Sequence, residues 1–239
     1  MASNASSKKR LDYFNLLSKK LGKVDGHSAI YQLKRGLIFK HAYGNAADIG
    51  AGEGVYTEWL ASVCRRVTAI DENSNMLEHL KERLADFKTV TVIPEDVLSA
   101  SIKHNTLDTV LSYSTLYLIP KYYDVLYRAH SWMVEGGTFI FDVTNYLSLG
   151  AMYSIVRWPI TQYSVPICDI KLFMDAIGFD IIEEHKTEAI PRVNLPFLKY
   201  ILDTRIGDIS LDELISSLPV VRNFAFRTTF VVQKRIGTL

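Results

Sequence analysis

From residue 46 onward, short apolar runs alternate with longer amphipathic stretches along the chain. Apolar runs of roughly four to eight residues bounded by turn residues are typical of buried strands, whereas apolar residues spaced three or four positions apart are typical of helices. The short runs predict strands at residues 46–49, 67–70, 90–93, 107–112 and 138–143. The stretches between them predict helices at 56–63, 74–87 and 122–133. This alternation indicates βαβ units around a mostly parallel sheet.

The two ends of the chain add further elements to this core. Helical spacing predicts two helices before the first strand, and the later part predicts a helix, a strand, two short helices and a last strand. In chain order these lie at residues 11–21, 28–42, 167–177, 179–184, 196–203, 211–218 and 224–232. The alternation of the last segment suits a hairpin strand at the edge of the sheet. We therefore predict a helical cap over residues 1–45 and one core over 46–239, with an insertion at about 186–222.

A glycine-rich turn follows the first predicted strand and reads Asp48-Ile-Gly50-Ala-Gly52-Glu-Gly54. Glycine permits positive φ and lets the backbone come close to a ligand. The helix that starts just after the turn offers unpaired N–H groups to a polar ligand. A dinucleotide fingerprint starting at Gly50 would need its third glycine at position 55, which is Val55. The turn is therefore a candidate binding site that differs from the dinucleotide type, or else a structural turn.

Acidic residues stand where two further strands end. Asp71 follows the second predicted strand, where a carboxylate can accept hydrogen bonds from two ribose hydroxyls. Its alternative role is that of an acid at a helix start. Glu72 is either a second ribose contact or a solvated charge, and Asp96 after the third strand has a turn-forming alternative. Because ligands bind outside the carboxyl ends of such strands, these acids and the glycine turn are expected to meet.

Together these features resemble the class I S-adenosylmethionine-dependent methyltransferases. The glycine pattern is similar to the family's first motif, whose loop wraps an amino-acid moiety, and Asp96 and Val97 match an acid at the adenine amino group followed by an apolar pocket residue. Residues 112–120 and Gly136-Gly137 are similar to the fourth motif and the turn into the fifth strand, so the resemblance covers roughly residues 46–184. It implies an α/β, Rossmann-like fold with a seven-stranded, mostly parallel sheet, helices on both faces and an antiparallel last strand. It also implies S-adenosylmethionine as cofactor, with these candidate binding residues: Asp48, Gly50, Ala51, Gly52, Asp71, Glu72, Asp96, Val97 and Ser112.

The reaction that this cofactor implies is an in-line attack on a sulfonium methyl group, in which positioning supplies much of the acceleration. Residues 112–120 read SYSTLYLIP. They contain no Asp/Asn-Pro-Pro run, no cysteine and no acid, which are the features that mark adenine, cytosine and protein-arginine methylases at this place. We therefore predict methyl transfer to oxygen or nitrogen of a small molecule. The alternatives are an RNA or protein methyltransferase, or a non-catalytic methyltransferase-like partner subunit.

Candidates for catalysis and acceptor binding are aromatic or polar residues near the expected methyl position. Tyr113, Tyr117 and His27 could orient an acceptor or take a proton, with packing or a surface position as the alternative. The cap and the segment after the fifth strand supply possible acceptor contacts, namely Tyr13, Tyr31, Asn145 and Tyr146. The six histidines lack metal-ligand spacing, so we expect no metal.

Composition and charge narrow the partners. A net charge of +1 argues against a nucleic-acid partner, and no apolar run approaches the ~20 residues of a membrane span. Cys64 and Cys168 are expected to be reduced thiols, and the first nine residues lack the apolar region of a secretory signal. We therefore expect a cytoplasmic monomer or homodimer without a transmembrane segment.

Overall fold

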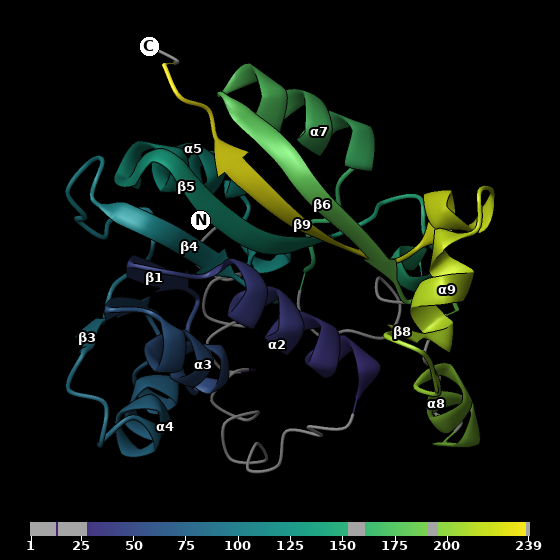
Figure 1. The fold of residues 1–239 in the computed structure, drawn as a ribbon, viewed down its shortest axis with the longest axis horizontal. Helices are drawn as coiled ribbons and strands as arrows, with labels where there is room; N and C mark the ends of the chain where they lie inside the picture. The colour runs from purple at the N-terminus through teal and green to yellow at the C-terminus, as the bar shows by residue number, and fades with distance from the viewer. Residues whose placement is uncertain (1–12, 14–27, 153–160, 191–195, 238–239) are drawn as a thin grey trace.

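A computed structural model describes residues 13, 28–152, 161–190 and 196–237, and its centre is a seven-stranded sheet (Figure 1). The strand order is β3-β2-β1-β4-β5-β9-β6; within this sheet the pairs from β3 to β5 are parallel, and β9 runs antiparallel to both β5 and β6. The strands are β1 (Asn45–Ile49), β2 (Arg66–Ile70), β3 (Val90–Ile93), β4 (Leu107–Ser112), β5 (Met133–Thr144), β6 (Phe179–Thr187) and β9 (Arg227–Lys234). The predicted Rossmann-like, mostly parallel sheet is confirmed.

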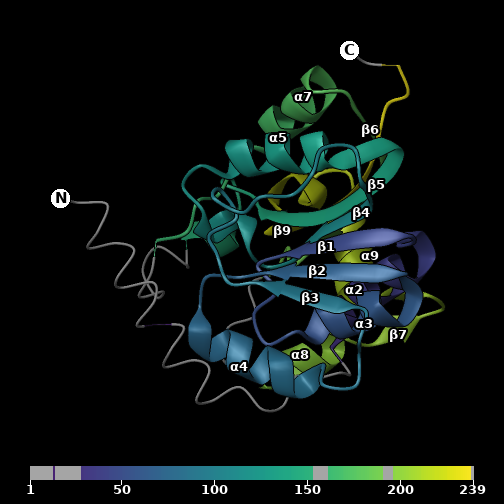
Figure 2. The ribbon, with the colours of Figure 1, turned by 90° about the vertical axis from the view of Figure 1, so that its left-hand side faces the viewer.

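Helices cover both faces of the sheet (Figures 1 and 2). One face carries α2 (Ala29–His41), α3 (Val55–Val63) and α4 (Ser74–Arg83), and the other carries α5 (Tyr122–Trp132) and α7 (Ile167–Ala176). Burial on both faces explains the apolar residues that follow one another in the central strands. In β4, for example, Val110 packs in the cluster with α5 and α7, and Leu111 packs in the cluster with α2 and α3.

Two strand positions differ from the sequence prediction. The fifth strand starts at Met133 and not at residue 138, because Gly136, with a φ of +75°, and Gly137 let the extended chain pass through the Gly-Gly pair. The last strand is not at the edge: β9 pairs with β5 on one side and β6 on the other, so β6 is the edge strand. Residues 228–232 of β9 are all buried, as expected of an inner strand and not of an edge strand.

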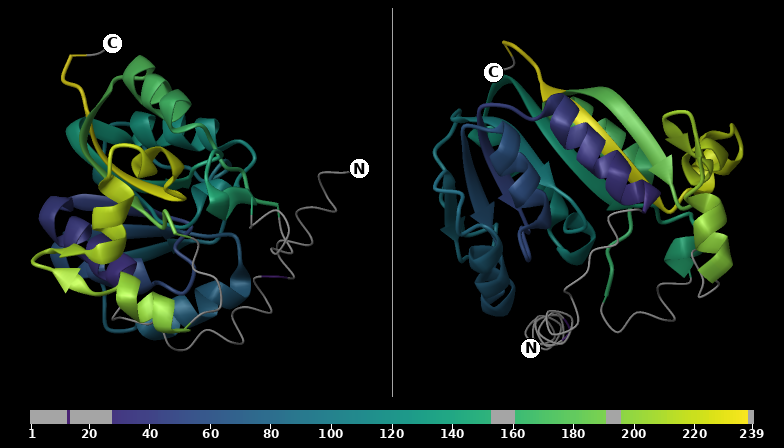
Figure 3. Two further views of the ribbon diagram at one scale, coloured as in Figure 1. Left: turned by 90° about the vertical axis from the view of Figure 1, so that its right-hand side faces the viewer. Right: turned by 60° about the horizontal axis from the view of Figure 1, so that its bottom comes forward.

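The insertion contains more than the two predicted helices. It holds α8 (Pro196–Leu202), β7 (Arg205–Ile206), β8 (Ile209–Ser210), α9 (Leu211–Ser217) and the 3₁₀ turn η2 (Val221–Phe224). The β7–β8 hairpin was not predicted. The insertion lies beside the start of α2, where the Ala29 N–H donates to Asp203 Oδ1 at 3.3 Å (Figure 3).

The cap is only partly described. The helix predicted at residues 11–21 lies outside the described residues except for Tyr13. The second predicted cap helix is α2, whose Leu37 and Ile38 share one apolar cluster with β1 and α3. At its far end, His41 Nε2 lies 2.7 Å from Glu183 Oε1 of β6. Within the described residues, no helix combines the length and apolar character that crossing a membrane requires.

Candidate cofactor site

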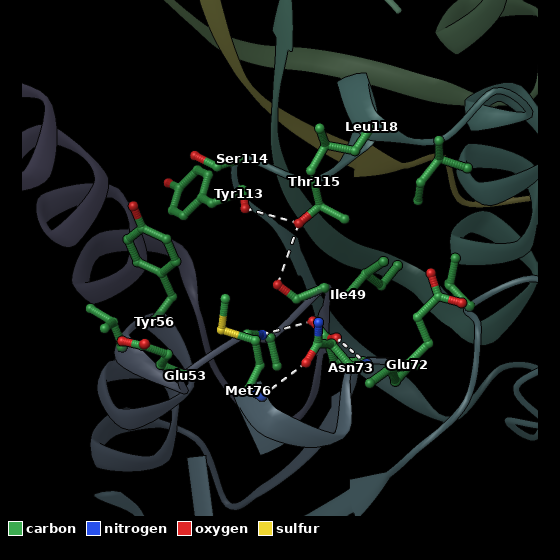
Figure 4. A pocket seen from close by; sticks show the side chains of 18 of the residues that line it. Ile49, Glu53, Tyr56, Glu72, Asn73, Met76, Tyr113, Ser114, Thr115 and Leu118 are labelled. Atoms are coloured by element: carbon green, nitrogen blue, oxygen red, sulfur yellow. Dashed lines mark hydrogen bonds between the residues drawn. The ribbon is translucent and has the colours of Figure 1, made fainter. Parts of the chain in front are cut away.

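A cavity of about 360 Å³ lies at the carboxyl ends of β1, β2, β3 and β4 (Figure 4). Each of these strands is followed by a segment that lines it, at residues 49–53, 70–73, 95–97 and 113–115. Tyr31 of α2 and Tyr56 of α3 complete one wall. This is the place where open parallel sheets bind ligands, because loops after neighbouring parallel strands converge there.

The glycine turn is held by backbone and side-chain hydrogen bonds. Gly50 has a φ of +73°, and its N–H donates to the Ile70 carbonyl oxygen at 2.8 Å. A Cβ at Gly50 would overlap the Thr115 side chain, so the loops after β1 and β4 touch there. Gly52 has a φ of +53°, and a Cβ there would meet nothing within 4 Å. The first glycine is therefore required by contact and conformation, and the second by conformation.

Asp71 joins the glycine turn to the segment after β2. Its Oδ2 accepts the Gly52 N–H at 2.9 Å, and its Oδ1 accepts the Asn73 N–H at 2.9 Å. The N-cap of α4 is Asn73, whose side chain accepts the Met76 N–H at 3.1 Å. Asp71 thus lines the cavity and shapes its floor, while the helix-capping role belongs to Asn73.

The other predicted cofactor residues divide into two groups. Ala51, Glu72, Asp96 and Val97 line the cavity, and the Asp96 carboxylate also accepts the Leu98 N–H at 2.8 Å, as in the turn-forming alternative. Asp48 and Ser112 are buried and do not line it. Asp48 Oδ2 accepts the Thr57 hydroxyl at 2.6 Å, and the Ser112 hydroxyl donates to the Ile49 carbonyl oxygen at 3.3 Å.

Burial raises the pKa of Asp48 to about 7, and the nearby Asp71 charge adds to this effect, although the Thr57 hydrogen bond opposes it. A side chain at the end of β1 that is turned toward α3 cannot reach the cavity. Asp48 and Ser112 therefore support the loops that line the site from behind.

The catalytic candidates are placed differently from one another. Tyr113 lines the cavity and its hydroxyl donates to the Lys34 carbonyl oxygen at 3.4 Å, whereas Tyr117 does not line it. Tyr117 packs against Arg227, whose guanidinium carbon lies 5.3 Å from the ring centroid. Burial raises the pKa of both tyrosines above the ordinary value, so neither is a base near neutral pH. His27 lies outside the described residues.

Of the predicted acceptor contacts, only Tyr31 lines the cavity. Asn145 is buried and its amide donates to the carbonyl oxygens of Asn223, at 2.8 Å, and Ala225, at 3.1 Å. This is a structural role that ties the end of β5 to the segment before β9. Tyr146 is 61% exposed, and neither it nor Tyr13 is among the lining residues.

Several lining residues carry no sequence signal that singled them out. They include Glu53, Glu95, Tyr56, Met76, Ser114, Thr115, Leu118 and Ile119. The sequence motifs identified the loops in which most of these residues lie. The geometry of each helix and turn determines which of their side chains face the cavity. Figure 4 shows Tyr56, Tyr113 and Ser114 together on one side of the cavity, with Glu72 and Asn73 across from them.

The charged side chains among the described lining residues of the cavity all have the same sign. Among the described lining residues five are acidic and none is lysine, arginine or histidine; the acids are Glu53, Asp71, Glu72, Glu95 and Asp96. Glu53 Oε1 has no hydrogen-bond partner within the described residues. Such a lining fits a cationic, amine-bearing nucleoside and disfavours a pyrophosphate. No group of three or more potential metal ligands occurs within the described part of the chain.

Comparison with known proteins agrees with this geometry. Residues 47–141 match the family model of a methyltransferase domain. Ribosomal RNA small subunit methyltransferase A of Levilactobacillus brevis is 40% identical over 58 residues, which are 24% of this chain and 20% of that protein. The chain thus spans about a fifth of the length of the curated relatives it matches.

Solved structures resemble the whole fold. A methyltransferase bound to the Trm112 methyltransferase activator of Haloferax volcanii has a TM-score of 0.70 at 14% identity, over 95% of this chain and 97% of that one. Phosphoethanolamine N-methyltransferase 2 of Haemonchus contortus, in complex with S-adenosyl-L-methionine, has a TM-score of 0.62 at 19% identity, over 86% of this chain and 53% of that one. Residues 47–141 thus match a methyltransferase domain, and the fold of the chain is that of the Rossmann-like class I methyltransferases.

Proposed function

We propose that the chain transfers the methyl group of S-adenosylmethionine to an oxygen or nitrogen atom of a small-molecule acceptor. The observation that supports the cofactor part of this proposal most is the acidic cavity without a cationic side chain among its described lining residues, because such a lining attracts the positively charged sulfonium and amino groups. The small-molecule part is supported by the aromatic residues Tyr31, Tyr56 and Tyr113 on one side of the cavity.

The cofactor fits the lining segment by segment. We assign the ribose to Asp71 and Glu72 after β2, and the adenine to Asp96 and Val97 after β3. The glycine turn borders the amino-acid portion, and the unpartnered Glu53 oxygen would accept an N–H from its amino group. When bound, S-adenosylmethionine supplies a methyl group activated by the sulfonium charge.

The acceptor side of the proposed site is aromatic. Tyr56 and Tyr113 are in edge-to-face contact with ring centroids 5.1 Å apart, and Tyr31 lies 6.3 Å from Tyr56. Burial raises the pKa of Tyr56 above its ordinary value, so it stays protonated and can donate a hydrogen bond but not remove a proton. These residues would orient the acceptor and exclude water, and the rate would come chiefly from positioning.

The cofactor part of the proposal is tested by calorimetry with the purified chain. S-adenosylmethionine and S-adenosylhomocysteine should bind, and NAD should not. Saturable NAD binding without a response to S-adenosylhomocysteine would contradict the site.

The acceptor part is tested by tritiated-methyl transfer into separated metabolite, RNA and protein fractions of a cell extract. Label in the metabolite fraction is expected, and label confined to RNA or protein would overturn the small-molecule assignment.

The likeness to the Trm112-bound methyltransferase supports a second candidate, a catalytic subunit that needs an activator protein. Transfer that appears only after a Trm112 protein is added would favour it.

A further inference from the structure

The loop after β4 reaches the cavity through a residue in a conformation that serine rarely adopts. Ser114 has a φ of +58°, in the left-handed region that favours glycine. It lines the cavity between Tyr113 and Thr115. The Thr115 hydroxyl donates to the Gly50 carbonyl oxygen at 3.4 Å, so this loop packs directly on the glycine turn. The backbone conformation of Ser114 therefore sets one wall of the cavity and its distance from the glycines.

Ser114 is held by a buried ion pair between two distant elements. Its N–H donates to Asp142 Oδ1 at 2.6 Å, and Lys34 Nζ donates to its Oγ at 2.9 Å. Lys34 Nζ and Asp142 Oδ2 are 2.7 Å apart. The Asp142 side chain, near the carboxyl end of β5, is fully buried, and that of Lys34, in α2, is 2% exposed. One carboxylate and one ammonium group thus clamp both the backbone and the side chain of the same residue.

The buried Asp142 carboxylate is paired with two positively charged side chains, Lys34 and Arg227. Burial alone would raise the pKa of Asp142, but Lys34 and Arg227 hold it below the ordinary value, so the carboxylate is ionised. Arg227 Nη1 contacts Asp142 Oδ2 at 2.9 Å from β9. Buried ion pairs can often be replaced by apolar side chains without loss of stability. An apolar side chain could not accept the Ser114 N–H, whereas an ionised carboxylate accepts it strongly.

We infer that Asp142, with Lys34, is a positioning residue of the cofactor site that holds Ser114 in the left-handed conformation and so sets the wall formed by residues 113–115. The inference rests on the proposed function of the cavity. Asp142 does not line the cavity and acts on it through Ser114.

The test is the affinity of the full-length chain for S-adenosylhomocysteine, measured by calorimetry. Asp142→Asn weakens the clamp and should reduce affinity by at least about tenfold. The matched control is Asp108→Asn: Asp108 accepts the Asn45 N–H at 2.7 Å, far from the cavity at the other end of β4, and its variant should bind within about twofold of wild type. Adding Ser114→Gly to Asp142→Asn should restore at least about threefold, since glycine needs no clamp to adopt positive φ. A purely structural role of the ion pair would not be rescued by that glycine.

A second pair of variants leaves the charges in place. Ser114→Val should bind at least about tenfold more weakly than Ser114→Gly, because a β-branched residue resists the left-handed conformation that glycine adopts freely. This pair decides the question if Asp142→Asn does not fold.

Wild-type affinity in folded Asp142→Asn, no rescue in the folded double variant, or equal affinity of Ser114→Gly and Ser114→Val would each overturn the inference. Absence of S-adenosylhomocysteine binding by the wild type would instead overturn the proposed function, and the inference with it.

Discussion

The two halves of the sheet contribute to the site in different ways. In the half made of β1 to β4, a segment that lines the cavity follows each strand, and these segments contact one another, as Asp71 does Gly52. In the half made of β5, β9 and β6, the side chains that act on the site do not line the cavity. Asp142 of β5 faces Arg227 of β9 and Lys34 of α2. The first half forms binding contacts, and the second holds them in place.

This difference predicts that variants in the second half lower stability and affect binding only through the loops that they hold, whereas variants of the lining residues in the first half affect binding directly. The largest effect is expected for Arg227→Met. The Arg227 side chain is 14% exposed, and its loss leaves Glu188 and Asp142 without a shared cation. Removing one member of a buried ion network costs about 3–5 kcal/mol, which urea unfolding would measure. The exposed Arg222, changed to Met, serves as control, and a loss below about 1 kcal/mol for Arg227→Met would contradict the comparison.

Gly50→Ala tests the first half at its tightest contact. The new Cβ must adopt positive φ and would overlap Thr115, so we expect a stability loss of about 2–3 kcal/mol and a loss of S-adenosylhomocysteine affinity of more than about thirtyfold. The control is Gly36→Ala in α2, where nothing lies within 4 Å and a gain of about 0.5–1 kcal/mol is expected. Equal affinities of the two variants would show that the glycine turn does not contact the ligand.

Asp71→Ala should weaken S-adenosylhomocysteine binding by at least about tenfold, since each hydrogen bond to a charged acceptor contributes about 1.5–3 kcal/mol. Part of that loss could come from the glycine turn, because Asp71 also accepts the Gly52 N–H. Titration with the 2′-deoxyribose analogue separates the two roles. A ribose contact predicts that wild type discriminates against the analogue and the variant does not, whereas unchanged discrimination would assign Asp71 to the turn alone.

Asp48→Asn is expected to have the smallest effect, and one that depends on pH. The pKa of Asp48 rises from an ordinary 3.8 to about 7 in the folded chain. The unfolded chain therefore ionises this group first, and wild type loses stability as the pH rises through this range. The variant lacks the group and should be about 1–2 kcal/mol more stable than wild type at pH 8, below the full value of the pKa difference because buried sites respond with a dielectric constant near 20. Thermal unfolding at pH 4 and pH 8 measures this, and an equal difference at both would refute the shift.

Most of the fold could be predicted from the sequence because strands and helices are encoded by local periodicity. The strands at 90–93 and 107–112 match β3 and β4, whereas the glycine pair concealed the true start of β5. The position of β9 between β5 and β6 could not be predicted. The alternation of apolar and polar residues along a strand indicates the face of the sheet on which each residue lies, but it does not indicate which strands pair.

For the site, the sequence by itself determined the loops that line it, because each follows directly on a strand and the carboxyl ends of parallel strands share one edge. It did not determine which side chains near those loops face the cavity. Asp48, for example, is turned toward Thr57 and away from the cavity. Only the tertiary structure brought Lys34, Ser114, Asp142 and Arg227 together. Their contacts join α2, the loop after β4, β5 and β9, and such contacts depend on how the elements pack and not on the spacing of residues along the chain.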